Sequence, residues 1–184
     1  HNRATTRTAE ALEIIEQHIG GNVDVVVMVQ GDEPLITPEA IAETLHHFSD
    51  PTVNIVNIMS KLPTLDAFVD KNNVKVVVDQ NNNALYFSRE PIPSPWNGWK
   101  HLPRYMQTGI IAFRRDTLLR FNAMSETQLE QIESVDMNRV LEMGERIRMV
   151  SINAFTIGVD TPEELMEAER CLRKDSVLHS YLKL

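Results

Sequence analysis

Apolar residues along the chain follow two spacings, one typical of amphipathic helices and one of buried strands. From residue 5 to 18, apolar side chains recur three and four positions apart, and the two glycines after Ile19 favour a helix end. Residues 23–29 are then almost continuously apolar, which predicts a strand covered on both faces, as in a parallel sheet. Thr37 and Pro38 are residue types that begin a helix. The order helix, strand, helix is typical of an α/β fold.

The middle of the chain predicts further strands followed by a long irregular segment. We expect a strand, a short helix and the two arms of a hairpin over residues 54–59, 64–69, 74–78 and 84–87. Residues 79–83 should form the turn of that hairpin, because Asp and Asn tolerate turn conformations. Between residues 91 and 103 the chain has four prolines and two tryptophans. Regular structure should stop there, and loops of this length are commonly functional or interfacial.

Strands and helices also alternate in the last third of the chain. We expect a strand, a short helix and another strand over residues 105–115, 116–124 and 146–153. Between them, one longer helix should carry the apolar stripe over 129–143 and end at Gly144. A final helix should begin at Pro162, with Thr161 as N-cap and Glu164 completing a capping box.

Composition narrows the class of protein. With 184 residues, 42% of them hydrophobic, and no linker that divides residues 1–184, the chain predicts a single α/β domain with three layers and a mostly parallel sheet. A formal net charge of -8 argues against binding to nucleic acid. No apolar run is long enough to cross a membrane, so we expect a soluble protein. The single cysteine, Cys171, fits a cytoplasmic setting and should pack rather than react.

Two acidic turns provide the candidate chemistry. Asp32 follows the apolar run at 23–29, and Asp160 lies in a similar turn just before the last predicted helix. Ligands collect outside the carboxyl ends of strands in open parallel sheets, and Mg²⁺ is commonly held by one or two carboxylates together with phosphates. The pair therefore favours a metal-assisted phosphate reaction. The alternative is that Asp160 caps a helix and that Glu33 and Pro34 form a plain turn.

Several motifs, taken in order, resemble one enzyme family. They are "HNRATTRTAEA", "VVMVQGDEPLI", "NVKVVVD" with "ALYFSREPIP", "TGIIAFRR", "LEQIESVDMNRVLEMGERI" and "IGVDTPEEL". Over residues 1–172 the chain resembles the 3-deoxy-manno-octulosonate cytidylyltransferase family. The resemblance implies a nucleotide-diphospho-sugar transferase-like (Rossmann-like) fold and a Mg²⁺-dependent reaction of CTP with an acidic sugar. That reaction would yield a CMP-sugar and pyrophosphate for the synthesis of a surface polysaccharide such as lipopolysaccharide.

The resemblance also implies roles for residues at matching positions. Asp32 and Asp160 match the family's metal-binding aspartates and would form the catalytic pair. Gln30 matches a residue that faces the sugar acid, although a strand-end amide bonded to backbone would give the same pattern. Arg89 would pair with the sugar carboxylate in a bidentate manner. Its alternative role is that of a surface or dimer-interface arginine.

The beginning of the chain is less typical of the family. Thr5 and Arg7 fall where the family has a loop near the nucleotide, and a plain helix N-terminus is the competing interpretation. The family usually begins with a strand and a basic loop, containing glycine and proline, that cradles the triphosphate. This chain begins at His1 without them. We therefore expect the chain to be a fragment, the larger C-terminal part of a cytidylyltransferase domain, that is inactive alone.

Three further positions depart from the family's pattern. Arg3 and Ala4 replace the usual Ser-Gly pair, and Gln107 stands where the family commonly has a histidine facing the sugar. Asp136 and Met137 replace a Glu-Gln pair. We take Gln107 and Asp136 as substrate-binding candidates. Because a pocket that hydrogen-bonds particular hydroxyls rejects analogues that lack them, these changes suggest a related but different acidic sugar.

Two other functions stay open from the sequence alone. The same fold could use another nucleoside triphosphate or acceptor, or the chain could be a non-catalytic module that binds nucleotide sugars. The two turn aspartates argue against the module. The resemblance further implies a homodimer, in which the segment 91–103 with Trp96 and Trp99 would meet a second copy. Those tryptophans could equally cover the chain's own core.

Overall fold

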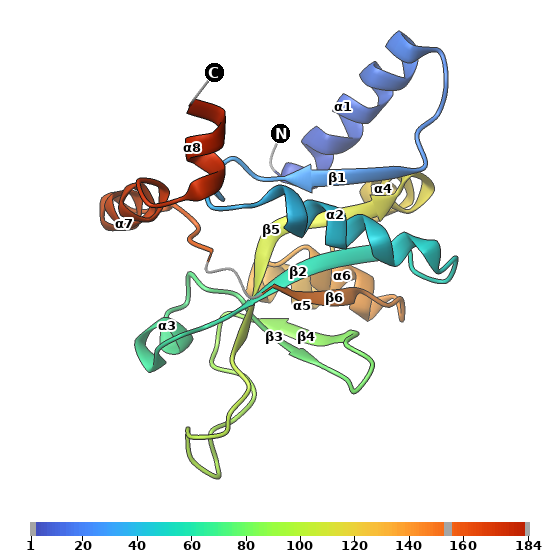
Figure 1. Ribbon diagram of the computed structural model, residues 1–184. Coiled ribbons are helices and arrows are strands. Elements are labelled where there is room, and N and C mark those ends of the chain that lie inside the picture. Colours follow the sequence, from blue (N-terminus) through green and yellow to red (C-terminus); the bar gives the residue numbers. More distant parts are fainter. Residues whose placement is uncertain (1–2, 153–155, 183–184) are drawn as a thin grey trace.

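A mixed β-sheet lies at the centre of the computed structural model, which describes residues 3–152 and 156–182 (Figure 1). The strands follow the order β4-β3-β5-β2-β6, and β1 pairs with β5 beside this path. They are β1 (Val25–Val29), β2 (Ile55–Lys61), β3 (Lys75–Val78), β4 (Ala84–Ser88), β5 (Tyr105–Arg114) and β6 (Arg148–Ile152). The α/β class is confirmed, but the predicted mostly parallel sheet is wrong: among the described pairings only β2 with β6 is parallel.

Most of the antiparallel pairing involves β5, which is antiparallel to β1, β2 and β3; the hairpin of β3 and β4 supplies the rest. Residues 23–29 do contain a strand, and β1 contacts apolar clusters on both faces as predicted, Val26 and Met28 on one and Val27 on the other, although the coverage is incomplete. Its first three residues are only partly buried, and Val29 is 43% exposed. A run of β-branched residues favours a strand, whereas the direction and coverage of that strand depend on distant segments that the local pattern does not reveal.

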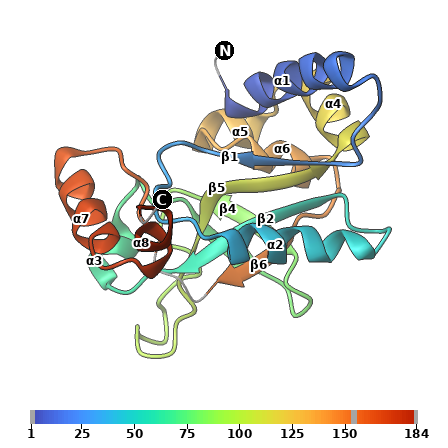
Figure 2. The same ribbon diagram turned by 45° about the horizontal axis from the view of Figure 1, so that its top comes forward.

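Helices cover both faces of the sheet, which confirms the three predicted layers (Figure 2). They are α1 (Ala4–Ile19), α2 (Pro38–His46), α3 (Leu65–Val69), α4 (Arg115–Ala123), α5 (Gln128–Glu133), α6 (Met137–Glu142), α7 (Pro162–Leu172) and α8 (Ser176–Leu182), with a 3-10 turn at His47–Ser49. On one face α1, α4 and α6 pack around Ile111 of β5. On the other face Ala40 of α2 packs against Ile110. Successive residues of β5 therefore serve two separate cores.

Signals at the helix ends act as the sequence predicts. Gly20 ends α1 in the left-handed conformation, with φ of 69°. The Thr37 hydroxyl accepts a hydrogen bond from the backbone N–H of Ala40 at 3.3 Å and caps α2. Thr161 and Glu164 form the predicted capping box of α7. These signals are local, so they act in the fold as they act in an isolated segment.

The long helix predicted over the stripe at 129–143 is wrong, because two helices replace it. Ser134 takes the left-handed conformation, with φ of 54°, and ends α5. The backbone N–H of Val135 donates back to the carbonyl of Glu130, and α6 then begins at Met137. The predicted stripe is not one buried face, because Ile132 is 68% exposed whereas Met137 and Val140 are buried, and the apolar spacing alone could not locate the break. The break turns residues 134–136 toward a cavity described below.

Helix α7 packs against the turn that follows β1. Ala168 of α7 clusters with Leu35 and Ile157, and Cys171 packs against this cluster, as predicted for a packing cysteine. The sequence analysis did not predict α8. None of the helices in the described residues is long and apolar enough to cross a membrane.

The proline-rich segment 91–103 has no helix or strand, as predicted, and projects from the body of the molecule (Figure 1). Its two tryptophans differ. Trp96 is 91% exposed, whereas the ring of Trp99 lies edge-on to Phe68 of α3, with the ring centroids 5.9 Å apart. Trp99 therefore covers the chain's own core, and Trp96 is left to solvent.

Candidate active site

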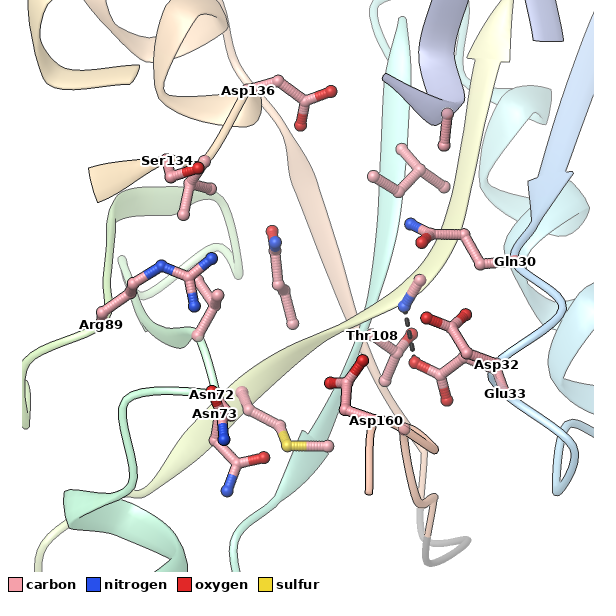
Figure 3. Close-up of a pocket in the computed structure, with 18 of the residues that line it drawn as sticks. Gln30, Asp32, Glu33, Asn72, Asn73, Arg89, Thr108, Ser134, Asp136 and Asp160 are labelled. Carbon is pink, nitrogen blue, oxygen red and sulfur yellow. Dashed lines mark hydrogen bonds between the residues drawn. The ribbon is translucent and has the colours of Figure 1, made fainter. Parts of the chain in front are cut away.

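A cavity of about 320 Å³ collects most of the predicted site residues (Figure 3). Six of the eight candidates line it: Gln30, Asp32, Arg89, Gln107, Asp136 and Asp160. Thr5 does not line it, but its hydroxyl donates to the Asp136 carboxylate at 3.2 Å. Arg7 lies outside as well and lines an adjoining cavity of about 280 Å³, which shares Gln30 and Asp32 with the first. The sequence therefore identified one continuous region.

The two acidic turns meet at one end of the cavity. The backbone N–H of Val159 donates to the carbonyl of Asp32 at 2.9 Å and joins the turn after β1 to the turn before α7. Both aspartate side chains lie on the cavity side of this junction in Figure 3. The alternative in which Asp160 caps α7 is wrong, because Thr161 is the cap. The carboxylate of Asp160 accepts no hydrogen bond from any described residue, so it is available to a ligand.

Glu33 is a third carboxylate in the same corner, and the sequence analysis gave it no role beyond a plain turn. It is 7% exposed, and its Oε1 accepts a hydrogen bond from the backbone N–H of Gly109 at 2.7 Å. Its Oε2 is buried without a partner among the described residues. Burial raises the pKa of Glu33, the charges of Asp32 and Asp160 act in the same direction, and the Gly109 hydrogen bond opposes them.

This corner has the donor types that a hard cation prefers. Asp32 and Asp160 supply exposed carboxylates, and Glu33 adds a buried oxygen that lacks a partner. Oxygen donors of this kind suit Mg²⁺, which usually keeps several waters and needs few protein ligands. Within residues 3–152 and 156–182, no group of three or more His, Cys, Asp or Glu side chains is arranged to hold a metal. The residues therefore fit a cation shared with a phosphate ligand better than a closed protein site.

Gln30 lies at the end of β1, where Gly109 leaves room for it. The backbone N–H of Gln30 donates to the carbonyl of Gly109 at 3.3 Å. A Cβ atom on Gly109 would lie 2.9 Å from the Cβ of Gln30, so only glycine fits beside this side chain. The amide group of Gln30 makes no hydrogen bond with the described residues. Its amide is therefore free to bind a ligand, as the resemblance implies.

Arg89 forms the opposite wall of the cavity. Its Nε donates to the carbonyl of Glu133 and its Nη1 to the carbonyl of Lys71, each at 2.9 Å. The Glu133 carboxylate accepts hydrogen bonds from the Arg89 backbone N–H at 2.9 Å and from the Ser88 hydroxyl at 2.7 Å. Burial acts to raise the pKa of Glu133, but these hydrogen bonds and that from Tyr86 outweigh it and lower the pKa. The guanidinium is thus held at the cavity wall by backbone acceptors.

Gln107 and Asp136 lie between these two ends. The Oε1 of Gln107 is buried and has no partner among the described residues. Burial raises the pKa of Asp136, while Arg3 and the Thr5 hydrogen bond act in the opposite direction. Ser134, which the sequence analysis missed, also lines the cavity. A serine in the left-handed conformation is unusual, and such strained residues cluster at functional sites.

The loop after α3 adds two cavity residues that the sequence did not indicate, Asn72 and Asn73. Both belong to an asparagine-rich stretch that precedes β3, and such stretches are usually plain turns. Their contribution depends on the fold bringing this loop beside Arg89. No local signal could have distinguished them from the asparagines at 81–83, which lie in the turn of the hairpin.

A helix-covered α/β sheet with carboxylates at one end of a cavity and a guanidinium at the other has groups for both a cation and an anion, as an enzyme acting on an anionic substrate needs. Residues 1–147 match the model of a family described as cytidylyltransferase. The chain belongs to the 3-deoxy-manno-octulosonate cytidylyltransferase family, as its curated relatives establish. The resemblance seen in the sequence motifs is therefore confirmed.

Two of these relatives give the extent of the match. One, from Pelobacter propionicus, is 38% identical over 184 residues, and another, from Geobacter metallireducens, is 40% identical over 176 residues. Both are named 3-deoxy-manno-octulosonate cytidylyltransferase. The matches cover 94% and 90% of this chain, and 70% and 67% of the relatives.

Solved structures confirm the fold. A CMP:2-keto-3-deoxy-manno-octonic acid synthetase complexed with CTP matches with a TM-score of 0.82 and 32% identity, over 95% of this chain and 69% of that one. A putative glucose-1-phosphate thymidylyltransferase from Bacillus anthracis matches with a TM-score of 0.58 and 17% identity, over 91% of this chain and 61% of that one. The second likeness concerns the fold alone. The predicted nucleotide-diphospho-sugar transferase-like fold is confirmed.

Proposed function

We propose that the protein transfers CMP from CTP to 3-deoxy-manno-octulosonate or a related 2-keto sugar acid, with release of pyrophosphate. The observation that carries this proposal is the cavity with Asp32 and Asp160 at one end and Arg89 at the other. Such a cavity would hold a polyphosphate and a carboxylate together, because a cation bound by the two aspartates would meet the phosphates and Arg89 would meet the carboxylate. The names of the curated relatives, and the CTP complex of the matching structure, support the choice of nucleotide and sugar.

In the proposed reaction, the anomeric hydroxyl of the sugar acid attacks the α-phosphorus of CTP. The new bond joins the anomeric oxygen to that phosphorus while the hydroxyl proton passes to solvent, the bond from the α-phosphorus to its bridging oxygen breaks, and pyrophosphate leaves. Arg89 would pair with the sugar carboxylate, and the amides of Gln30 and Gln107 would orient the sugar hydroxyls. Orientation of this kind lowers the barrier because the reacting atoms start close together.

Mg²⁺ is the proposed cofactor, with Asp32 and Asp160 as its protein ligands. The ion would offset phosphate charge on CTP. The side chains present support this proposal by their chemistry, since both are exposed carboxylates in one corner of the cavity. Arg7 lines the adjoining cavity beside Asp32, where it would meet the nucleotide, and Thr5 would act indirectly by holding Asp136.

Pyrophosphate release measured with each of the four nucleoside triphosphates and a panel of sugar acids tests the proposal. We expect activity with CTP and 3-deoxy-manno-octulosonate or a close analogue. The sugar acid that reacts best tests whether Gln107 and Asp136, which replace other residues of the family, change the specificity for the sugar. A preference for UTP or GTP, or a lack of turnover in the complete gene product, would contradict the proposal.

We further propose that the protein forms a homodimer through the segment 91–103. Trp96 supports this, because an aromatic side chain that is 91% exposed on a projecting loop is typical of an interface anchor. Trp99 is the internal counterpart, packed on Phe68. Light scattering on the wild-type protein should give the mass of two chains, and Trp96→Ser should lower it. A wild-type monomer would contradict the dimer.

A further inference from the structure

Lys75 of β3 is a charged residue in the interior, outside the contacts of the proposed reaction. Its side chain is fully buried. Its Nζ donates to the backbone carbonyls of Asp70 at 2.7 Å and Asn73 at 2.6 Å, and to that of Arg89. An ammonium has three donors, and here each has an acceptor. Burial of a charge is costly unless it is fully hydrogen-bonded, so this arrangement depends on all three carbonyls.

The three carbonyls belong to the segments that form the arginine side of the cavity. Asn73 and Arg89 both line the cavity. Arg89 also reaches back to this loop, because its Nη1 donates to the carbonyl of Lys71. The loop after α3 and the end of β4 are therefore joined three times: through the Lys75 ammonium, through the Arg89 guanidinium, and through an exposed ion pair of Lys71 with Glu90 at 2.6 Å. Only the Lys75 link is made by a buried side chain, so its loss would leave Arg89 and the loop held by the two exposed links alone.

We propose that Lys75 is a positioning residue for the anion-binding side of the cavity, where it fixes Arg89 and Asn73 and so sets the affinity for the carboxylate of the sugar acid. This inference rests on the proposed function. Lys75 does not line the cavity, so it acts through Arg89 and not by touching the substrate. A buried apolar residue at this place in β3 would pack as well but would leave three carbonyls without donors.

The charge on Lys75 should make the affinity for the sugar acid depend on pH. Burial lowers the pKa of Lys75 to about 8; the charges of Asp70, Glu90 and Glu133 raise it and that of Arg89 lowers it further. The neutral amine has only two N–H donors, so above this pH one carbonyl loses its partner. Affinity for the sugar acid should therefore fall as the pH rises through about 8.

The first test compares Lys75→Met with wild type in the complete gene product. We expect KM for the sugar acid to rise about tenfold, with kcat and KM for CTP changed by less than about threefold. Lys61→Met is the matched control, because Lys61 is an exposed strand lysine that does not line the cavity, and it should leave all three constants unchanged. An unchanged KM for the sugar acid in Lys75→Met would overturn the inference.

A double-mutant cycle separates positioning from a general loss of structure. If Lys75 acts through Arg89, the effect of Lys75→Met on sugar KM should largely vanish in an Arg89→Ala background. Equal effects in both backgrounds would overturn the inference.

Calorimetry on the wild-type protein with 3-deoxy-manno-octulosonate, from pH 7 to 9.5, requires neither folding of a variant nor turnover. Weaker binding above about pH 8 is expected, and a flat profile would contradict the role of Lys75. Absence of CTP-dependent turnover with intact sugar binding would instead contradict the proposed function, so the two failures can be told apart.

Discussion

Glu33 links the acidic corner of the cavity to the centre of the sheet, so its removal should be measurable in stability. Glu33→Ala would leave the partly buried N–H of Gly109 without its acceptor at 2.7 Å. An unsatisfied buried donor costs about 1–3 kcal/mol. A middle value of about 2 kcal/mol corresponds to a fall in Tm of about 4–8 °C for a chain of this size. Glu33→Gln keeps an oxygen acceptor for Gly109 and should lose less than about half as much.

Glu33 should also make the stability of the protein depend on pH. Burial raises the pKa of Glu33 above its ordinary 4.5. Between pH 4.5 and the raised pKa, the native state therefore holds a proton that the unfolded state has lost. The stability that this proton provides is complete below pH 4.5 and falls as the pH rises through the native pKa. Glutamine cannot titrate, so the stability of Glu33→Gln relative to that of wild type should increase as the pH rises.

Thermal unfolding of wild type, Glu33→Ala and Glu33→Gln should be measured with EDTA present, from below pH 4.5 to above the native pKa of Glu33. The measurement tests both the lost hydrogen bond and the dependence on pH. The reasoning would be refuted by an alanine variant as stable as wild type, or by a glutamine variant as unstable as the alanine variant. A constant difference between wild type and Glu33→Gln at every pH would refute the account of the pKa.

Three further changes have definite expected outcomes. Gly109→Ala should displace the Gln30 side chain, which a new Cβ would approach at 2.9 Å, and raise KM for the sugar about tenfold in steady-state assays. Glu130→Gln should lower the free energy of unfolding by about 3–5 kcal/mol in urea titrations, because it breaks a buried two-point pair with Arg139. Ser134→Gly should raise Tm slightly, since glycine accepts a φ of 54° without strain. An opposite sign in any of the three would contradict its stated cause.

The parts of the fold that the sequence predicted correctly depend on signals within a few residues. The caps at Thr37 and Thr161 and the helix end at Gly20 are examples, because a hydroxyl or a missing side chain acts on its immediate neighbours. The predicted direction of β1 was wrong, because that direction is set by pairing with β5, which lies about eighty residues later in the chain. The break at Ser134 was missed because the apolar spacing continues through it in the sequence, although Ile132 of α5 is exposed in the fold.

The residues of the candidate site also divide into those that a local motif marks and those whose role depends on contacts distant in sequence. Gln30, Asp32 and Asp160 line the cavity; the two aspartates were proposed from their turns, where ligands collect in α/β folds, and Gln30 from the resemblance to the family. Glu33 and Lys75 received no functional role, since their significance lies in bonds to Gly109 and to the carbonyl of Arg89, which are distant in sequence. A short motif can mark a residue that touches a ligand, but residues that hold the site in place are visible only in the fold.

The central claim is that Asp32 and Asp160 together support a metal-dependent transfer of CMP. Pyrophosphate release from CTP and 3-deoxy-manno-octulosonate, measured against Mg²⁺ concentration, tests it most directly in wild type, Asp32→Asn and Asp160→Asn. Asp116→Asn is the matched control, because Asp116 is an exposed aspartate that pairs with Arg115 away from the cavity. We predict that wild type and control require Mg²⁺, and that each site variant loses at least about 100-fold in kcat at saturating substrate. Full activity in EDTA, or wild-type rates in both site variants, would contradict the account.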